Sequence, residues 1–264
     1  MLLQDLAYTV ENKVGLITLN RPAVLNAVRR ETWLELSAVL RKVKEESAVR
    51  CLVITGAGKA FCAGQDLNEM GAIAGDQVDY FAIRESVELM QQVTLELLNL
   101  PVPVIAAING YAVGAGAEIA IACDIRYASE KARFEFAEVK VGLFETNGVT
   151  WLLPRLIGLG RAKELMLTGD RFGAAEALSM GLVTRVYPPG DLLPAALETA
   201  SRIAKNAPVP IRFVKSCLNK SGEIGLEEAL ISETDAVMTC CYTADLREGV
   251  RAFFENRDPE FKGR

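Results

Sequence analysis

Residues 109–129 read NGYAVGAGAEIAIACDIRYAS, a Gly-rich turn that leads directly into an apolar segment. The run before it, VIAAI at 104–108, has the apolar, β-branched character of a buried strand. The segment after the glycines predicts a helix that begins near Ala115. The same order of strand, Gly-rich loop and helix recurs loosely, without a strict repeat, at 14–43 and 51–98. The sequence therefore predicts an α/β protein with a β-rich core.

The chain changes character beyond Pro154. Apolar residues at helical spacing, interrupted by glycines, predict helices at 162–167, 174–180, 192–206, 211–218 and 226–254. Extended structure is expected before this region, at 14–19, 51–56, 125–129 and 132–136. The segment 205–210, which contains NAPVP, is the best linker between the core and the terminal helices.

The composition excludes several classes of protein. The 264 residues are 50% hydrophobic and 24% charged, which is typical of a globular chain and not of a disordered, collagenous or coiled-coil one. With 29 basic and 34 acidic residues the formal charge is -5, and no five like charges stand together. A nucleic-acid-binding surface is therefore not expected.

The chain contains no histidine, which excludes Ser-His-Asp and Cys-His nucleophiles and every His-ligated metal site. Acid–base chemistry therefore falls to carboxylates, Lys, Tyr or Cys. The six cysteines form no CxxC pair and stand mostly in apolar runs, which predicts buried thiols in a reducing, cytoplasmic compartment. Cys62 is expected to be a packing residue, since no histidine can activate it.

The uncharged stretch 97–117 is long enough to raise the question of a membrane span. It contains Pro101, Pro103, Gly110 and Asn109, which favour a strand, a turn and a helix of a protein without a membrane span. The N-terminus lacks a basic segment followed by an apolar one, so we expect no leader peptide.

Two glycine pairs follow strands: Gly56 with Gly58, and Gly114 with Gly116. A dinucleotide-binding fingerprint needs a third glycine three residues later, where this chain has Phe61 or Ile119. Both loops fail that test, and the phosphate-loop pattern GxxxxGK is absent from the sequence. Each loop is then either a plain turn or a place where backbone N–H groups and a ligand come close together.

Four acidic residues attract attention near these loops. Glu118 is the single ionisable residue of an apolar helix, so it is either a satisfied structural carboxylate or a tuned catalytic one. Along 138–142, Glu138, Lys140 and Gly142 alternate with two valines, so Glu138 is either a functional carboxylate or part of the exposed face of a strand. Asp66 and Asp124 end Gly- or Ala-rich turns and are expected to be caps.

Seven strings of the sequence form an ordered pattern: RPAVLNAV at 21–28, LVITGAGKAFCAGQDL at 52–67, NGYAVGAGAEIAIACDIRYAS at 109–129, FAEVKVGL at 136–143, LPRLIG at 153–158, EALSMGLVTRV at 176–186 and the ending EGVRAFFENRDPEFKGR. They contain AGxD, GxGxE and a later Glu-x-x-x-Gly, a set that is specific in this order, whereas each motif alone is not. Together these strings resemble the enoyl-CoA hydratase/isomerase, or crotonase, family from about residue 10 to the C-terminus.

The resemblance implies a crotonase-like (ClpP/crotonase) fold of the α/β class, a spiral of β-β-α units. It divides the chain into a core domain over 1–200, which holds the acyl-CoA site, and a C-terminal helical region over 201–264 for trimerisation and pocket closure. It also implies a homotrimer, or a hexamer made of two trimers, in the cytoplasm, without nucleic-acid or membrane partners.

The resemblance further implies an enoyl-CoA hydratase in which an acyl-CoA thioester is held by two backbone N–H groups, those of Gln65 and Ala115. Glu118 and Glu138 match the catalytic pair of such hydratases. No metal and no separate cofactor are expected, because coenzyme A is part of the substrate. The residues that correspond to substrate and CoA contacts are Ala23, Val24, Leu25, Ala63, Gly64, Asp66, Leu67, Tyr111, Val113, Gly114, Phe253 and Arg257.

Two positions depart from the family pattern. Hydratases usually have Pro-Gly where this chain has Glu145-Thr146, so Glu145 is either an exposed loop acid or a third carboxylate near the acyl pocket. Asn256 replaces a basic residue that can meet the CoA phosphate, a contact that Arg257 could supply instead. An isomerase or decarboxylase of the same fold, a non-catalytic acyl-CoA-binding subunit and a nucleotide-binding α/β protein stay open as alternatives.

Overall fold

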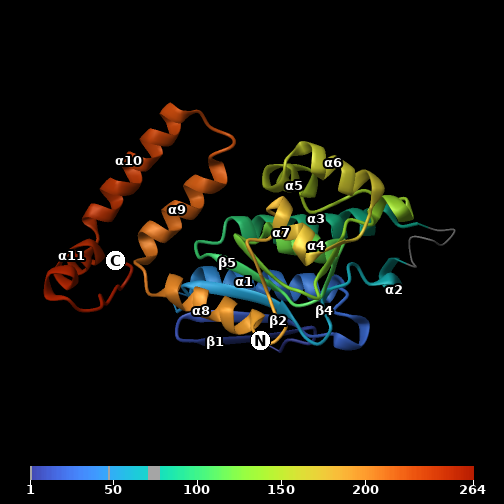
Figure 1. Cartoon of the computed structure of the whole chain (residues 1–264), viewed down its shortest axis with the longest axis horizontal. Helices are drawn as coiled ribbons and strands as arrows, with labels where there is room; N and C mark the ends of the chain where they lie inside the picture. Colours follow the sequence, from blue (N-terminus) through green and yellow to red (C-terminus); the bar gives the residue numbers. More distant parts are fainter. Residues whose placement is uncertain (1, 47, 71–77) are drawn as a thin grey trace.

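A computed structural model describes residues 2–46, 48–70 and 78–264, which form two β-sheets and the helices that cover them (Figure 1). The larger sheet has the strand order β1-β2-β3-β5-β7-β10, and all of its neighbours are parallel except β1 and β2. Its strands are β1 (Leu6–Glu11), β2 (Val14–Leu19), β3 (Cys51–Gly56), β5 (Val104–Ile108), β7 (Ile125–Ser129) and β10 (Arg185–Tyr187). The strands predicted at 14–19, 51–56, 104–108 and 125–129 are confirmed.

The smaller sheet has four short strands in the order β4-β6-β8-β9, of which only β8 and β9 are antiparallel. They are β4 (Ala60–Cys62), β6 (Tyr111–Val113), β8 (Arg133–Glu135) and β9 (Phe172–Gly173). From β3 to β8 successive strands alternate between the two sheets, and α3 follows the pair β3 and β4 while α4 follows the pair β5 and β6. This alternation is the β-β-α spiral that the resemblance implied.

Helices make up most of the remaining chain. Their bounds are η1 (Pro22–Val24), α1 (Arg30–Glu45), α2 (Leu67–Met70), α3 (Tyr80–Leu98), α4 (Ala115–Ala122), η2 (Glu138–Val141), α5 (Val149–Ile157), α6 (Leu159–Thr168), α7 (Ala174–Met180), α8 (Leu192–Ala204), α9 (Pro208–Lys220), α10 (Leu226–Tyr242) and α11 (Ala244–Glu255). Among the described residues, no helix has both the length and the apolar composition that a membrane crossing needs. The uncharged stretch 97–117 is divided among α3, β5, β6 and α4.

The main hydrophobic core lies between the two sheets, α1, α3 and α4, and its largest fully buried side chains include Trp33, Phe61, Phe134 and Phe136. A second core forms where α8 covers another part of the large sheet, with Ala196 among its members. Helix α4 is buried along its whole length, as expected of a helix that is apolar on every side. Glu118 is its only charged residue, so its carboxylate is held inside the protein.

The C-terminal helices α9, α10 and α11 project away from the sheets (Figure 1). Helix α9 is joined to the core by Lys215, whose Nζ pairs with Asp124 at 2.8 Å and donates to the carbonyl oxygens of Leu97 and Val102. Asp124 is therefore an ion-pair residue rather than the predicted cap. The single helix predicted over 226–254 is wrong, because Thr243 ends α10 and its side chain caps α11 by accepting from the N–H of Leu246.

The segment after β8 also differs from its sequence pattern. Residues 138–142 alternate in polarity and allowed an exposed strand, but the chain forms the 3-10 helix η2 there. Gly142, with φ of +75°, ends this turn, and the N–H of Leu143 donates to the carbonyl oxygen of Glu138. The turn directs Glu138 toward the Gly-rich loop after β6 instead of into solvent.

The close packing of α4 on β4 leads to a first prediction. A Cβ on Gly116 would clash with the carbonyl oxygen of Cys62, so we expect Gly116→Ala to lower the free energy of unfolding by ~1–3 kcal/mol. Gly160→Ala on α6 is the matched control, because no atom lies within 4 Å of a Cβ there. That control should be neutral or stabilise the protein by up to ~1 kcal/mol. Urea unfolding of both variants measures the difference, and equal stability would contradict the packing argument.

Candidate active site

Two loops meet at one edge of the small sheet. β4 and β6 are parallel, with Cys62 opposite Ala112, so both loops leave the sheet at the same edge. The loops touch, since a Cβ on Gly64 would lie 3.1 Å from the carbonyl oxygen of Val113. Gly114 turns the chain with φ of +48°, a conformation that favours glycine, and α4 begins at the next residue.

The two loops present the N–H groups that the sequence singled out. Ala115 is the first residue of α4, so its N–H has no acceptor within the helix. Gln65 pairs with Val28 in a short parallel bridge, in which the N–H of Val28 donates to Gly64 and the N–H of Asp66 donates to Val28. The N–H of Gln65 takes no part in this bridge and has no acceptor in the part of the chain that the structure describes. Free backbone donors of this kind, one of them at a helix N-terminus, are groups to which a negatively charged oxygen can bind.

The side chain of Gln65 is engaged elsewhere. Its Oε1 accepts from Trp33 Nε1 at 3.3 Å, and its Nε2 donates to Glu69 at 2.9 Å. Gln65 therefore offers its backbone N–H to the site, and not its side chain.

Glu138 closes the site from the start of η2. Its Oε1 lies so near Gly114 that a Cβ on that glycine would come within 2.5 Å of it. Its Oε2 is buried and has no hydrogen-bond partner among the described residues. The carboxylate of Glu138 thus lies against Gly114, the residue that precedes Ala115.

Glu118 is held by a loop that follows η2. Its side chain is 1% exposed, and four donors from two residues reach its two oxygens. Oε1 accepts from the N–H of Thr146 at 3.0 Å and that of Asn147 at 3.4 Å. Oε2 accepts from Thr146 Oγ1 at 3.2 Å and Asn147 Nδ2 at 2.7 Å. These donors favour the ionised form of Glu118. The sequence analysis did not identify them, and the one sequence signal for them is a polar pair, Thr146 and Asn147, placed just before Gly148 and an apolar helix.

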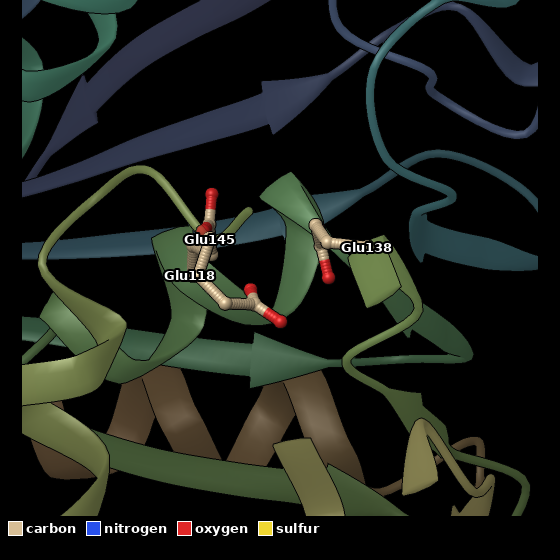
Figure 2. A group of neighbouring side chains, drawn as sticks. All are labelled: Glu118, Glu138 and Glu145. Carbon is tan, nitrogen blue, oxygen red and sulfur yellow. The ribbon is translucent and has the colours of Figure 1, made fainter. Parts of the chain in front are cut away.

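Glu145 joins this pair of carboxylates. It is 6% exposed, so the interpretation as an exposed loop acid is wrong. One carboxylate oxygen from each of Glu118, Glu138 and Glu145 lies within 4.8 Å of those from the other two. In Figure 2 Glu118 and Glu145 stand next to each other and Glu138 faces them from the opposite side. Both oxygens of Glu145 are buried without a hydrogen-bond donor in the described part of the protein.

The crowding of these carboxylates changes their acidity. Burial raises the pKa of Glu118, and the charge of Glu138 adds to that effect, while the donors from Thr146 and Asn147 oppose it. Burial, together with hydrogen bonding to Glu138 and the charges of Glu138 and Glu118, raises the pKa of Glu145 to about 9. No Lys or Arg of the described residues forms an ion pair with any of the three. Three full negative charges therefore do not persist here at neutral pH.

Three carboxylates could also hold a hard divalent cation. Glu118 fits that role poorly, because an ionised carboxylate has about four acceptor positions and its neighbours occupy four. The charge of Glu118 acts on the thiol of Cys62, and burial raises the pKa of that thiol to about 12. Cys62 is thus a protonated packing residue, as its surroundings in the sequence suggested.

The predicted substrate contacts near the N-terminus lie beside the site. Ala23, Val24 and Leu25 are exposed, and the N–H of Ala63 donates to the carbonyl oxygen of Leu25 at 3.1 Å. Leu67, at the other end of the same loop, is 77% exposed.

Asp66 lies in this loop but is occupied structurally. It pairs with Arg21 at 2.9 Å and accepts from the N–H of Asn68, which confirms the predicted cap. On the β6 side, Tyr111 is 39% exposed, and Val113 and Gly114 carry the chain to Ala115.

Phe253 and Arg257 do not join the site within one chain. Phe253 is on α11, at the opposite end of the molecule from α2 and α4 (Figure 1). Arg257 follows α11 and pairs with Glu248 and Glu255, each at 2.6 Å. These two contacts with substrate would have to be made in a neighbouring subunit, and they stay predictions.

A cavity of about 770 Å³ adjoins the loop that holds Glu118. Thr146, Asn147 and Trp151 form one wall, and Leu95 of α3 and Lys215 of α9 contribute to the others. None of the three glutamates lines it, so the cavity lies beside the carboxylates and does not contain them.

Comparison with known proteins gives a consistent result. A sequence profile of the enoyl-CoA hydratase/isomerase family matches residues 9–264. The short-chain-enoyl-CoA hydratase of Clostridium acetobutylicum is 40% identical over 266 residues, covering 100% of this chain and 100% of that protein. The 1,2-epoxyphenylacetyl-CoA isomerase of Escherichia coli is 38% identical over 257 residues, 97% of both chains. The crystal structure of an enoyl-CoA hydratase from Bacillus anthracis has a TM-score of 0.94 at 38% identity, covering 99% of this chain and 100% of that one.

The hydrogen bonds of Glu118 lead to a second prediction. Asn147→Leu removes the donor at 2.7 Å, so we expect a loss of ~1–3 kcal/mol in the free energy of unfolding at pH ~8, because the charged form of Glu118 depends on that donor most. The loss should shrink toward pH ~4, because a protonated Glu118 no longer needs that donor. Asn99→Leu is the control, since Asn99 donates to the neutral carbonyl oxygen of Leu95. A loss for Asn147→Leu that is equal at both pH values would show that the charge of Glu118 is not involved.

Proposed function

Because the chain belongs to the enoyl-CoA hydratase/isomerase family, we propose that it adds water to the double bond of trans-2-enoyl-CoA thioesters. The observation that carries this proposal is the position of Glu138 and Glu118 beside the free N–H groups of Gln65 and Ala115. A site with donors for an oxyanion and a pair of carboxylates in different surroundings suits the addition of water to a conjugated thioester.

The N–H groups act on the thioester oxygen. Attack of water on the β-carbon moves negative charge through the conjugated system to that oxygen, which becomes an enolate oxygen. The N–H groups of Gln65 and Ala115 stabilise this charge, and the dipole of α4 adds to the effect at Ala115. Backbone donors are fixed before the reaction, so little reorganisation is needed.

The carboxylates handle the protons. Glu118, whose charged form is stabilised by donors from Thr146 and Asn147, accepts a proton from the attacking water as the C–O bond forms. Its bonds at 3.2 and 3.4 Å are the longest, and a water molecule could replace one of them. Glu138 gives a proton to the α-carbon, which completes the addition of one water molecule.

Substrate binding is proposed along the edge formed by 23–25 and 63–67, where exposed side chains flank the loop of Gln65. Coenzyme A is part of the substrate, so the reaction needs no separate cofactor. A shift of the double bond is the second candidate reaction, because it uses the same N–H groups and Glu138 alone. The similarity to an isomerase, at 38% identity, favours keeping it.

We also propose that the chain assembles as a trimer or a hexamer. Helix α10 buries none of its residues, and it exposes apolar side chains that include Leu226, Ile231 and Val237. Light scattering after size-exclusion chromatography measures the assembly state, and a monomer at micromolar concentration would contradict this proposal.

The direct test is a panel of short, branched, aromatic and long enoyl-CoAs, followed through the absorbance of the conjugated thioester. We expect Glu118→Gln and Glu138→Gln each to lower kcat by ~100-fold or more, because general acid and base groups contribute about that much. Binding of the CoA ester should change little. A parallel assay with 3-enoyl-CoA separates hydration from isomerisation. If both variants keep the parent's turnover, the two glutamates do not carry the reaction.

A second pair of variants tests the N–H donors. Ala115→Pro removes a donor at the first position of a helix, where proline is tolerated, and should lower kcat by ~100- to 1000-fold. Gln65→Ala keeps its N–H and loses only the contacts with Trp33 and Glu69, so kcat should stay within ~10-fold of the parent. Equal damage from both variants would mean that the side chain of Gln65 contacts the substrate.

A further inference from the structure

We propose that Glu145 holds the proton that Glu138 delivers to the substrate, and that it returns the proton taken up by Glu118. Glu145 is then a positioning residue that acts through Glu138. The inference rests on the proposed hydration for its catalytic part, while the protonation of Glu145 itself can be tested without any substrate.

The surroundings of Glu145 carry the first step. It is 6% exposed, and neither oxygen faces an N–H or O–H group of the described residues. The carboxylates of Glu138 and Glu118 lie close to it. Ionised carboxylates only accept hydrogen bonds, so a bond between Glu145 and one of these neighbours requires a proton on one of the two groups. A buried carboxyl in this position is stable as the protonated acid.

The second step is the difference between the three glutamates. Glu118 accepts from four donors, and Glu145 from none. Glu138 has one buried oxygen without a donor, Oε2, and the other oxygen beside Gly114. A proton placed on Glu145 can therefore form a hydrogen bond to Glu138 and leaves the bonds of Glu118 intact.

The third step is the absence of compensating charge near the three carboxylates. Glu138 belongs to η2, Glu118 to α4, and the titratable group of β4 beside them is the thiol of Cys62. Lys140, also on η2, pairs with Glu135 at 3.3 Å, and Arg171 pairs with the same carboxylate. Since no Lys or Arg of the described residues forms an ion pair with the three glutamates, a shared proton lowers the repulsion within the cluster.

The proton circuit then balances. At the start Glu118 is ionised and one proton is shared by Glu145 and Glu138. Water gives OH to the β-carbon and its proton to Glu118, while the shared proton goes through Glu138 to the α-carbon. The proton on Glu118 next passes to Glu145, which restores the starting state. The net change is the addition of one water molecule, with no oxidant or further reactant.

Glu145→Gln tests this role, because glutamine has the shape of the protonated acid and cannot release its proton. In the parent, the shared proton should keep kcat/KM for an enoyl-CoA nearly constant up to pH about 9. In the variant, the amide donates to Glu138 and no proton remains to be shared between two carboxyl groups. We expect the alkaline limb to move down by about one pH unit or more. Glu164→Gln, on the exposed face of α6, is the control and should leave the profile unchanged.

Infrared spectroscopy tests the protonation directly. At pH 8 the parent should show the C=O stretching band of a buried carboxylic acid, which disappears as the pH passes about 9. The band should be missing from Glu145→Gln at pH 8 and present in Glu164→Gln. A parent without the band, or a variant that retains it, would overturn the proposal. This measurement stands even if the parent hydrates no enoyl-CoA, in which case only the proposed function fails.

Two kinetic results would also overturn it. Superimposable pH profiles of the parent and Glu145→Gln would mean that Glu145 has no part in proton delivery. Loss of the parent's activity after treatment with EDTA, with recovery on addition of Mn²⁺, would mean that a cation neutralises the three carboxylates in place of a proton.

Discussion

The close approach of two backbone segments determines most of the site. The carbonyl oxygen of Cys62 lies against Gly116, and Gly64 lies against Val113, so the ends of β4 and β6 are packed without intervening side chains. Parallel pairing of these strands brings both loops to the same edge of the small sheet. A larger residue at Gly116 would separate the loops, and with them the N–H groups of Gln65 and Ala115. The spacing of the two donors therefore depends on the packing of the backbone.

The fixed position of Gly114 also decides where Glu138 lies. η2 places its carboxylate in the space that a side chain at residue 114 would occupy. The acid is thus next to the first N–H of α4, and a group that binds there meets a donor and a carboxylate together. In the same way, the loop after η2 uses Thr146 and Asn147 to hold Glu118, which α4 has carried into the interior. One turn and one loop therefore position both carboxylates.

Three glutamates within 4.8 Å of one another differ only in their surroundings. Four donors support the charge of Glu118, whereas Glu145 has none and its pKa rises to about 9. Identical side chains can thus serve as a base and as a store of protons, because burial and hydrogen bonding act on each one separately. In this site without histidine, the burial of Glu145 among other carboxylates produces one group whose pKa lies above neutral pH.

The sequence by itself determined the strands β2, β3, β5 and β7 and the start of α4, because these depend on local periodicity. It also showed that Glu118 is the single charged residue of an apolar helix, and its ordered motifs indicated the family. Tertiary structure alone decided that Glu145 is buried, that Thr146 and Asn147 bind Glu118, and that Phe253 lies far from the site in one chain. The tertiary structure also divides the segment 226–254, predicted as one helix, into two helices at Thr243. Glu118 and Asn147 are 29 residues apart, and a loop acid has the same sequence pattern whether it faces solvent or other carboxylates. Such contacts join segments that are distant along the chain, so they are set by how the segments pack and not by their local pattern.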